Sequence, residues 1–519
     1  MKTNLLSSEL QERTLTFFAL GGSGARTIEP LLHLCAMGLG PLKLRIVIID
    51  PDQSNAGVTR ARRLMELYRR VRELVGEGGA PAGYFRTEIL DPIKDTLVWS
   101  PVADDEFLPS PKFAARAGRP EMERGAQPLG KAFDLLYAER IREMDLGRGF
   151  RGVPSIGTVF MNRLRREPFF RQILTDAQTE ARSVFFAVGT TFGGTGAAAL
   201  PVIGRSLSGG IRQDPDQPDS DGPDVHGIES GRIGAALLLP YFTLPSPRAG
   251  EQERVRPEAA LFAQNAAAAI PTYLSNEPGY GAYYILGDNE PREQPVNEVG
   301  GDKQANTAHY IELFAALAAL DFAARPAPDR AGARPAFRIT AVGGSDLGWD
   351  DLPITESSLR RMMGAVVAVH TYLTVFHPER ALRPDLGRYL SGATWLELLH
   401  MRGADLDARG EALHRVGEYY EGIWHWLGEL RASTPGLHAS GSTQNPVNLR
   451  LDEAVAFRKH AGSHATRRIK DEFQVFRDWN LAAHRRRGEG LPGLLETARE
   501  GSEAFAQRWF GAPANGRSA

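Results

Sequence analysis

Four residues in the middle of the chain, Gly193-Gly194-Thr195-Gly196, carry the most specific chemical signal in the sequence. They follow an apolar run, residues 183–188, and precede an alanine-rich segment with helix character. Small residues at such a turn let backbone N–H groups approach an anion closely, and the next helix aims its positive end at the same place. No Gly-Lys-Ser/Thr closes the loop, so it is not a P-loop. The pattern predicts a phosphate-binding loop of another kind.

A second glycine loop, Gly21-Gly22-Ser23-Gly24, lies near the N-terminus. It follows the apolar residues 15–20 and opens a segment with helical periodicity. Taken alone, this loop also matches a dinucleotide-binding turn, in which an acidic residue further along binds a ribose. The glycine loop in the middle of the chain favours phosphate binding instead, because dinucleotide folds have no use for a second loop there.

Two acidic residues, Asp50 and Asp52, follow the apolar residues 45–49. Strand, glycine turn, helix, strand and acidic end together are typical of a nucleotide-binding half-unit in a parallel sheet. Asp52 is either an indirect Mg²⁺ ligand, acting through water, or a plain turn carboxylate. Arg26 either contacts phosphate or is a solvated helix residue. Asp50 belongs to the predicted nucleotide site in both interpretations of the first glycine loop.

The composition is that of an ordinary globular protein. The 519 residues are 42% hydrophobic and 24% charged, which allows two or three domains with a sizeable core. A formal net charge of −2 gives no general support for nucleic-acid binding. The single cysteine, Cys35, excludes an intrachain disulfide framework, and no apolar stretch approaches the roughly 18 residues that span a bilayer. We therefore expect a cytoplasmic protein without a membrane span.

The order of apolar runs and glycine turns predicts an α/β fold with a mostly parallel, Rossmann-like sheet. We expect a nucleotide-binding domain over residues 1–305, with a loop-rich stretch at 101–130 and a flexible insertion at about 208–231. A long apolar helix follows at 306–324. Residues 325–510 read as a mainly helical C-terminal domain, and 511–519 as a disordered tail.

The order of these loops resembles that of the tubulin/FtsZ GTPase superfamily, and the chain is similar to a divergent bacterial tubulin-like protein. The resemblance covers roughly residues 15–351. The loops that carry it are Gly21–Arg26, Asp50-Pro51-Asp52, Ala117-Gly118-Arg119-Pro120-Glu121, Gly193–Gly196, Pro240-Tyr241-Phe242, Asp288-Asn289 and Asn306.

The resemblance implies that the chain binds GTP or GDP together with Mg²⁺. It implies that Gly118 belongs to a loop that senses the γ-phosphate and that Asn289 lies on the base side. Asn306, which would open the long helix, would read guanine, because a side-chain amide can accept from the ring N–H and amino group of that base. The alternative for Asn306 is a helix N-cap, which asparagine also serves well.

In the same family, hydrolysis needs two subunits, and the second inserts an acidic loop that positions the attacking water. The corresponding segment here makes Asp346 and Asp350 the candidate catalytic acids, with Asp351 as a register-shifted choice. The alternative is that Asp350 and Asp351 cap the helix that begins near Thr355. The resemblance further implies self-association through the nucleotide face, as an oligomer or filament.

Two departures from the family pattern keep other functions open. Phe192 replaces a small residue at the start of the signature, and Ala198 replaces its final glycine. The helical C-terminal third lacks the alternating strands of the usual second domain. One alternative is therefore a non-hydrolysing, nucleotide-gated scaffold that meets a protein partner through its C-terminal helices. Another is a Rossmann-type enzyme that binds NAD(P) or an adenylate.

Overall fold

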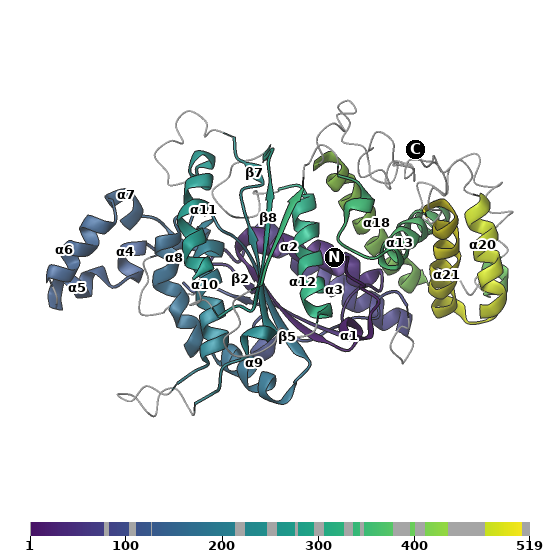
Figure 1. The fold of residues 1–519 in the computed structure, drawn as a ribbon, viewed down its shortest axis with the longest axis horizontal. Helices are drawn as coiled ribbons and strands as arrows, with labels where there is room; N and C mark the ends of the chain where they lie inside the picture. The colour runs from purple at the N-terminus through teal and green to yellow at the C-terminus, as the bar shows by residue number, and fades with distance from the viewer. Residues whose placement is uncertain are drawn as a thin grey trace, which may run out of the picture.

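The computed structural model is an α/β protein built around one parallel sheet (Figure 1). It describes residues 2–76, 83–102, 111–125, 127–212, 224–245, 257–275, 279–294, 301, 306–325, 336–342, 347–376, 395–399, 410–433 and 473–510. The strands of the sheet are β1 (Thr14–Leu20), β2 (Lys43–Ile49), β3 (Glu88–Ile89), β4 (Val98–Trp99), β5 (Ser183–Thr190), β6 (Ile233–Leu238), β8 (Ala282–Asp288) and β10 (Ala336–Val342). All their pairings are parallel, which confirms the predicted α/β class with a mostly parallel sheet.

The strand order is β10-β8-β6-β5-β1-β2-β3, with β4 beside β2. The strands that follow β1 in the chain therefore lie on one side of it, as β2 and β3, and those from β5 onward lie on the other side. Both strands are buried along nearly their whole length, as expected for central strands covered on two faces. Leu20, the last residue of β1, lies opposite Gly189 of β5, so both glycine loops leave the same edge at the same level. Ligands of open α/β sheets bind at such a reversal of strand order, outside the carboxyl ends of the strands.

Helices cover both faces of the sheet, and each face has its own apolar core (Figure 1). The helices on one face are α2 (Gly21–Ala36), α3 (Ala56–Gly76) and α12 (Tyr310–Ala324). Those on the other are α8 (Pro154–Met161), α9 (Pro168–Thr179), α10 (Gly194–Gly209) and α11 (Ala259–Leu274). The smaller elements are α1 (Ser8–Gln11) and a two-stranded sheet of β7 (Phe242–Thr243) and β9 (Arg292–Glu293).

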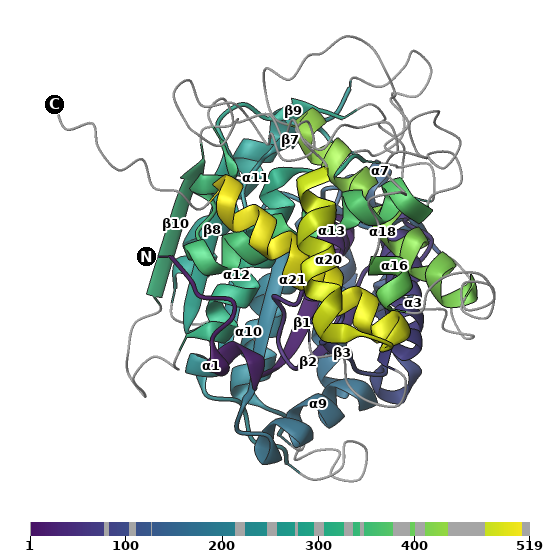
Figure 2. The same ribbon diagram turned by 90° about the vertical axis from the view of Figure 1, so that its right-hand side faces the viewer.

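The C-terminal helices form a further layer outside α3 and α12 (Figure 2). They are α13 (Glu356–Phe376), α16 (Trp395–Leu398), α18 (Gly410–Ser433), α20 (Phe473–Ala483) and α21 (Gly490–Phe510). Helix α13 packs against α18 and α21, and α18 packs against α3. Four tryptophans of this layer are fully buried and are therefore core residues: Trp395, Trp424, Trp426 and Trp479.

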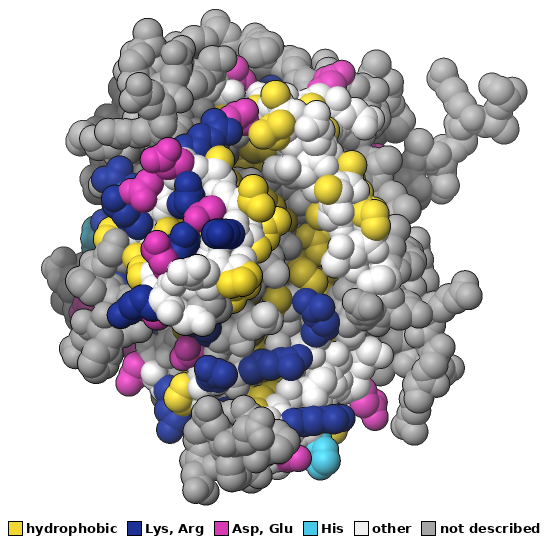
Figure 3. Space-filling view, turned by 90° about the vertical axis from the view of Figure 1, so that its left-hand side faces the viewer, with side chains coloured by type: hydrophobic (Ala, Val, Ile, Leu, Met, Phe, Trp, Pro, Cys, Tyr) yellow, Lys and Arg dark blue, Asp and Glu magenta, His cyan; other side chains and the backbone are white. Residues whose placement is uncertain are grey.

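The stretch that we expected to be loop-rich, residues 101–130, is helical over much of its described part. It contributes to a group of short helices at the left of Figure 1: α4 (Phe113–Arg116), α5 (Arg119–Gly125), α6 (Gln127–Leu136) and α7 (Glu139–Arg142). The Arg119 guanidinium joins α5 to α6 through two hydrogen bonds to Asp134, 3.0 and 2.6 Å long. Basic and acidic side chains lie next to one another on this face (Figure 3). The glycine and proline at 118–120 mark a turn between helices rather than a long loop.

Three predicted boundaries differ from those in the structure. The long helix begins at Tyr310 instead of Asn306. Strand β10 belongs to the main sheet, so the sheet extends past the predicted end of the nucleotide-binding domain at residue 305. Helix α10 runs to Gly209, into the predicted insertion; residues 213–223 of that insertion and the tail 511–519 lie outside the described residues. No described helix is both long and apolar enough to cross a membrane.

Candidate functional site

A cavity of about 260 Å³ opens at the carboxyl edge of the sheet, where the strand order reverses. It lies among the ends of β1, β2 and β5 and the first turns of α2 and α10. The predicted site residues that line it are Gly21, Gly22, Ser23, Arg26, Asp50, Asp52, Gly193, Gly194, Thr195, Gly196 and Asn306. The structure therefore brings together predicted residues that are up to 285 positions apart in the chain, from Gly21 to Asn306.

Helix α2 begins directly at the end of β1, and its first residue takes a left-handed conformation. Gly21 has φ +72°, where glycine alone is free of strain, and the Cβ that another residue would add lies 3.2 Å from Thr195 Cβ. The N-cap residue, Leu20, provides no side-chain hydrogen bond to the first turn. The N–H groups of this turn are thus left to a ligand or to water.

Gly24 belongs to the same loop but serves packing and does not line the cavity. A Cβ at this position would lie 2.7 Å from the carbonyl oxygen of Val188 and 2.8 Å from the carbonyl carbon of Ala19. Only glycine lets α2 approach β1 and β5 so closely. This is the role of the third glycine in glycine-rich nucleotide-binding turns.

Helix α10 begins in a similar way at the end of β5. Its N-cap, Gly193, has no side chain to cap the helix, and its own N–H donates to Thr190 Oγ1 at 3.2 Å. A Cβ on Gly194 would lie 2.7 Å from Phe150 Cβ, and one on Gly196 would lie 2.7 Å from the Thr190 nitrogen. Two uncapped helix N-termini therefore meet at one cavity, and each favours a bound anion.

Asp50 and Asp52 are both buried at the end of β2 and line the cavity. The Asp52 N–H donates to Asp50 Oδ1 at 3.0 Å, while Asp52 Oδ1 accepts from the Ser54 hydroxyl at 2.8 Å and Oδ2 accepts from the Gly301 N–H at 2.6 Å. Burial raises the pKa of Asp50 to about 7; the Asp52 N–H opposes this shift and the Asp52 charge adds to it. Burial therefore disfavours the charged form of Asp50, and a bound cation would favour it.

The donor set at Asp50 and Asp52 fits Mg²⁺ shared with a ligand. Mg²⁺ keeps several waters and is held by one or two carboxylates plus substrate phosphates. Within the described residues there is no cluster of three or more histidine, cysteine or acidic side chains that would make a protein-only metal cage. Asp52, whose oxygens already accept from Ser54 and Gly301, suits contact through water.

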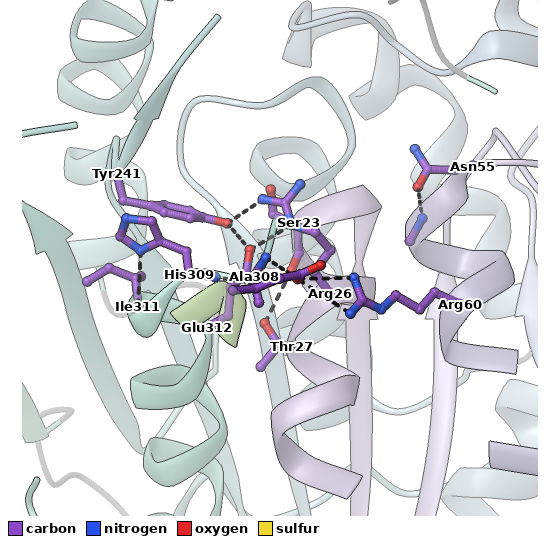
Figure 4. Close-up of polar contacts among 12 residues, drawn as sticks. Ser23, Arg26, Thr27, Asn55, Arg60, Tyr241, Ala308, His309, Ile311 and Glu312 are labelled. Carbon is purple, nitrogen blue, oxygen red and sulfur yellow. Dashed lines mark hydrogen bonds and ion pairs between the residues drawn. The ribbon is translucent and has the colours of Figure 1, made fainter. Parts of the chain in front are cut away.

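Arg26 is not the solvated helix residue of our alternative, because its side chain is largely buried and lines the cavity; its contact with phosphate stays a prediction. Its Nε donates to Glu312 Oε1 at 2.6 Å and its Nη2 donates to the Tyr241 hydroxyl at 2.7 Å (Figure 4). Burial opposes the positive charge, but Glu312 and Tyr241 outweigh it and raise the pKa of Arg26 above its ordinary value. This arginine is an ion-paired residue of the cavity rim.

Arg60, from α3, forms a second charged part of the rim. Its Nη2 lies 2.8 Å from Glu29 Oε1, and its Nη1 lies 3.3 Å from Glu429 Oε2 of α18. The same Glu429 oxygen accepts the Ala308 N–H at 2.8 Å. Arg60, Glu29 and Ala308 all line the cavity, so one carboxylate joins the cavity to the C-terminal helices.

Phe192 forms an apolar wall. The Phe192 side chain is buried and packs against Phe262 of α11 and Phe242 of β7, with ring centroids 4.5 and 5.7 Å away. Asn265 holds its backbone, because Nδ2 donates to the Phe192 carbonyl at 3.3 Å. The large residue at the start of the signature thus shapes one side of the cavity with aromatic surface.

Asn306 lines the cavity but does not cap or open α12. The N-cap is His309, whose Nδ1 accepts the Ile311 N–H at 3.2 Å, while its own N–H donates to Glu312 Oε2 at 3.1 Å. These two bonds form a capping box. Both the helix-opening position and the N-cap alternative predicted for Asn306 are therefore wrong.

Of the remaining predicted residues, those that the structure describes do not line the cavity. Gly118, with φ +77°, lies in the turn between α4 and α5, and Asn289 is exposed at the turn after β8. Asp350 is exposed in a 3-10 helix, Trp349–Asp351. Asp351 Oδ2 accepts the Gly348 N–H at 2.6 Å, which caps this short helix rather than α13. Asp346 lies outside the described residues.

Sequence reasoning missed a third wall of the cavity, formed by residues 148–152. This Arg-Gly-Phe-Arg-Gly segment has two arginines and two glycines in five positions. That density of glycine beside cations is the signal that could have marked it as a loop near an anion. Five residues at and just before the start of α3 also line the cavity and were not predicted as site residues: Asn55, Ala56, Gly57, Arg60 and Ala61.

No protein-family model matches the chain, and no curated protein is similar to it at a significant level.

Proposed function

We propose that this chain binds GTP with Mg²⁺ in the cavity, as a divergent member of the tubulin/FtsZ superfamily. The observation that carries the proposal is the meeting of two uncapped helix N-termini, α2 and α10, at the switch point of a parallel sheet. Each terminus offers backbone N–H donors and a positive dipole end, so together they suit a polyphosphate. A dinucleotide site uses one such glycine loop.

The other walls of the cavity support the remaining parts of the ligand. Asp50 and Asp52 would hold Mg²⁺ through water and phosphate oxygens, and this cation neutralises charge on the phosphates. The aromatic cluster at Phe192 provides an apolar surface for a base or sugar. Asn306 lines the cavity, and an amide there can accept from guanine.

We propose further that hydrolysis is completed by a neighbouring subunit through Asp346 and Asp350. Asp350 is exposed and does not line the cavity of its own chain, as a shared active site requires. A carboxylate placed beside the γ-phosphate in this way would orient the attacking water or accept its proton. The chain would then self-associate through its nucleotide face.

A nucleotide-gated scaffold is the second candidate, and the Arg60 bridge favours it. Arg60 lines the cavity and is shared between Glu29 and Glu429 of α18. Phosphates in the cavity would compete with Glu429 for this cation, and the position of α18 would then depend on the ligand. Such a device can signal to a protein partner without hydrolysis.

The test is phosphate release from GTP at saturating GTP and Mg²⁺ over a range of protein concentrations, together with direct binding of GTP, ATP and NAD(P). A rate per molecule that climbs with concentration supports the shared active site. Tight GTP binding with a low, flat rate supports the scaffold. Binding of NAD(P) or ATP in preference to GTP would overturn the proposal in favour of a Rossmann-type enzyme.

A further inference from the structure

The loop at residues 148–152 lies directly on the N-terminus of α10. It follows a 3-10 helix, Leu146–Arg148, and leads into α8. Phe150 is fully buried, and its carbonyl carbon and oxygen both lie 2.9 Å from the position of a Cβ on Gly194. A Cβ on Gly152 would lie 3.3 Å from Pro257 Cα. The loop is therefore fixed between α10 and the segment before α11, and its position is set by packing.

The backbone of this loop is strained. Gly149 and Gly152 have φ +81° and +77°, and Arg151 between them has φ +47°, although it carries a side chain. Non-glycine residues rarely take this conformation, and strained positions cluster at ligand-binding and active sites. Here the conformation lets both Arg148 and Arg151 line the cavity on either side of the buried Phe150.

Arg148 is the arginine of the cavity whose charge is unpaired in the described part of the chain. Arg26 pairs with Glu312, Arg60 pairs with Glu29, and Arg151 donates to the Asp145 carbonyl at 3.2 Å. Arg148 is exposed and, over the ranges that the structure describes, has no hydrogen-bond or ion-pair partner. A free guanidinium beside two uncapped helix N-termini has the chemistry to bind phosphate oxygens.

We propose that Arg148 binds the phosphate chain of the nucleotide from the α10 side of the cavity. The proposal rests on the proposed function and deepens it, because it names the side chain that makes affinity depend on the number of phosphates. Charge-assisted contacts of an exposed arginine to phosphate account for about a tenfold change in affinity.

The test compares Arg148→Ala with Arg140→Ala by titration calorimetry. Arg140, in α7, is exposed and likewise has no partner in the described part of the chain, so it controls for the loss of one positive charge. The probes are GTP, GDP and GMP with Mg²⁺, and inorganic tripolyphosphate as a probe without a base. We expect Arg148→Ala to weaken GTP and tripolyphosphate binding about tenfold and GMP binding much less. Arg140→Ala should leave every affinity unchanged, and thermal unfolding should match the wild type for both variants.

The outcomes separate this proposal from the proposed function. Wild-type binding of GTP with equal affinities in both variants would overturn the role of Arg148 and leave the nucleotide site standing. If GTP does not bind but tripolyphosphate still binds in an Arg148-dependent way, the proposed nucleotide binding would be wrong and the proposed contact between Arg148 and phosphate would stand. Failure of the wild type to bind any of the four probes would overturn both.

Discussion

Among the helices that begin close to the cavity, α2, α10 and α12 differ in one respect at their N-termini. Helices α2 and α10 start from Leu20 and Gly193, and neither N-cap residue donates or accepts through a side chain. Helix α12 starts from His309 and has a complete capping box with Glu312. The N–H groups at the first two termini are available to a ligand, whereas side chains of α12 and its N-cap accept hydrogen bonds at the third terminus.

This difference assigns roles within the cavity. An uncapped N-terminus inside a protein needs a partner, and a phosphate supplies one with the right charge. A capped terminus needs none, and in α12 the capping Glu312 also neutralises Arg26. We therefore expect α2 and α10 to govern binding and α12 to govern stability.

The largest expected effect follows from Glu312→Gln. Glutamine keeps the capping box but removes the charge that pairs with Arg26, whose side chain is only 13% exposed. Leaving a largely buried cation without its partner should lower the free energy of unfolding by about 3 kcal/mol. Urea unfolding of the variant measures this. The double variant Arg26→Met/Glu312→Gln should recover much of the loss; an unchanged single variant would show that capping alone holds the end of α12.

Ser23→Asp should separate binding from stability at an open terminus. Ser23 is in the first turn of α2 and lines the cavity. A carboxylate there is favourable to the helix dipole, so stability should stay within about 0.5 kcal/mol of the wild type. Because the carboxylate repels phosphate, Mg²⁺-GTP binding should fall about 100-fold. Calorimetric titration measures the affinity, with Ser23→Ala as the uncharged control. Equal affinities in the two variants would argue against phosphate at α2.

Gly24→Ala tests packing beside the same terminus. The added methyl would meet backbone atoms of Val188 and Ala19, which cannot rotate away. We expect a loss of about 2 kcal/mol in the free energy of unfolding. The matched control is Gly422→Ala in the interior of α18, where a Cβ meets nothing within 4 Å. That change should stabilise the protein by about 0.5 kcal/mol through helix propensity, so a loss in both variants would refute the packing explanation.

The last prediction is a pH dependence at the capped terminus of α12. Burial, together with the charges of Arg26 and Arg292, lowers the pKa of His309 from 6.5 to about 3. Asp288 Oδ2, 3.7 Å from His309 Nε2, is too distant for a hydrogen bond that would offset burial. Below pH 6.5, His309 therefore gains a proton in the unfolded chain, whereas in the folded chain it stays neutral down to about pH 3.

It follows that His309 makes stability fall as the pH drops through this window, by at most about 1.4 kcal/mol per pH unit. His309→Asn keeps an N-cap side chain without the titration. In urea unfolding, the free energy of unfolding of the wild type should fall steadily relative to that of the variant from pH 6.5 to pH 4.5. His484→Asn, a change at an exposed histidine, is the control and should show a constant difference.

Local patterns predicted the parts of the site that follow strands directly. An apolar run that stops at glycines fixes the end of a strand and the start of a helix, so the loops at Gly21 and Gly193 were found from sequence. Parallel strands then place their carboxyl ends at one edge, which brings in Asp50 and Asp52. None of these inferences needs knowledge of distant contacts.

The predictions that were wrong or missing concern residues whose positions depend on contacts between distant segments. Asn306 and His309 can both cap a helix, and the choice is made by Glu312, which also pairs with Arg26 from another helix. Arg148 reaches the cavity because Phe150 packs on Gly194, 44 positions away in the chain. The glycines and arginines at 148–152 could mark a loop near an anion, but neither of these two distant contacts has a local signal in the sequence.

The Glu429 carboxylate has a consequence for how the chain can be divided. It accepts from Arg60 of α3 and from the Ala308 N–H before α12, and the neighbouring turns of α18 place Tyr419 and Trp426 against the buried ring of His33. A fragment cut before α18 would lose the acceptor for both donors and the cover of His33. We therefore expect the cavity and the C-terminal helices to unfold as one cooperative unit, so that the cavity cannot be moved to another protein by itself.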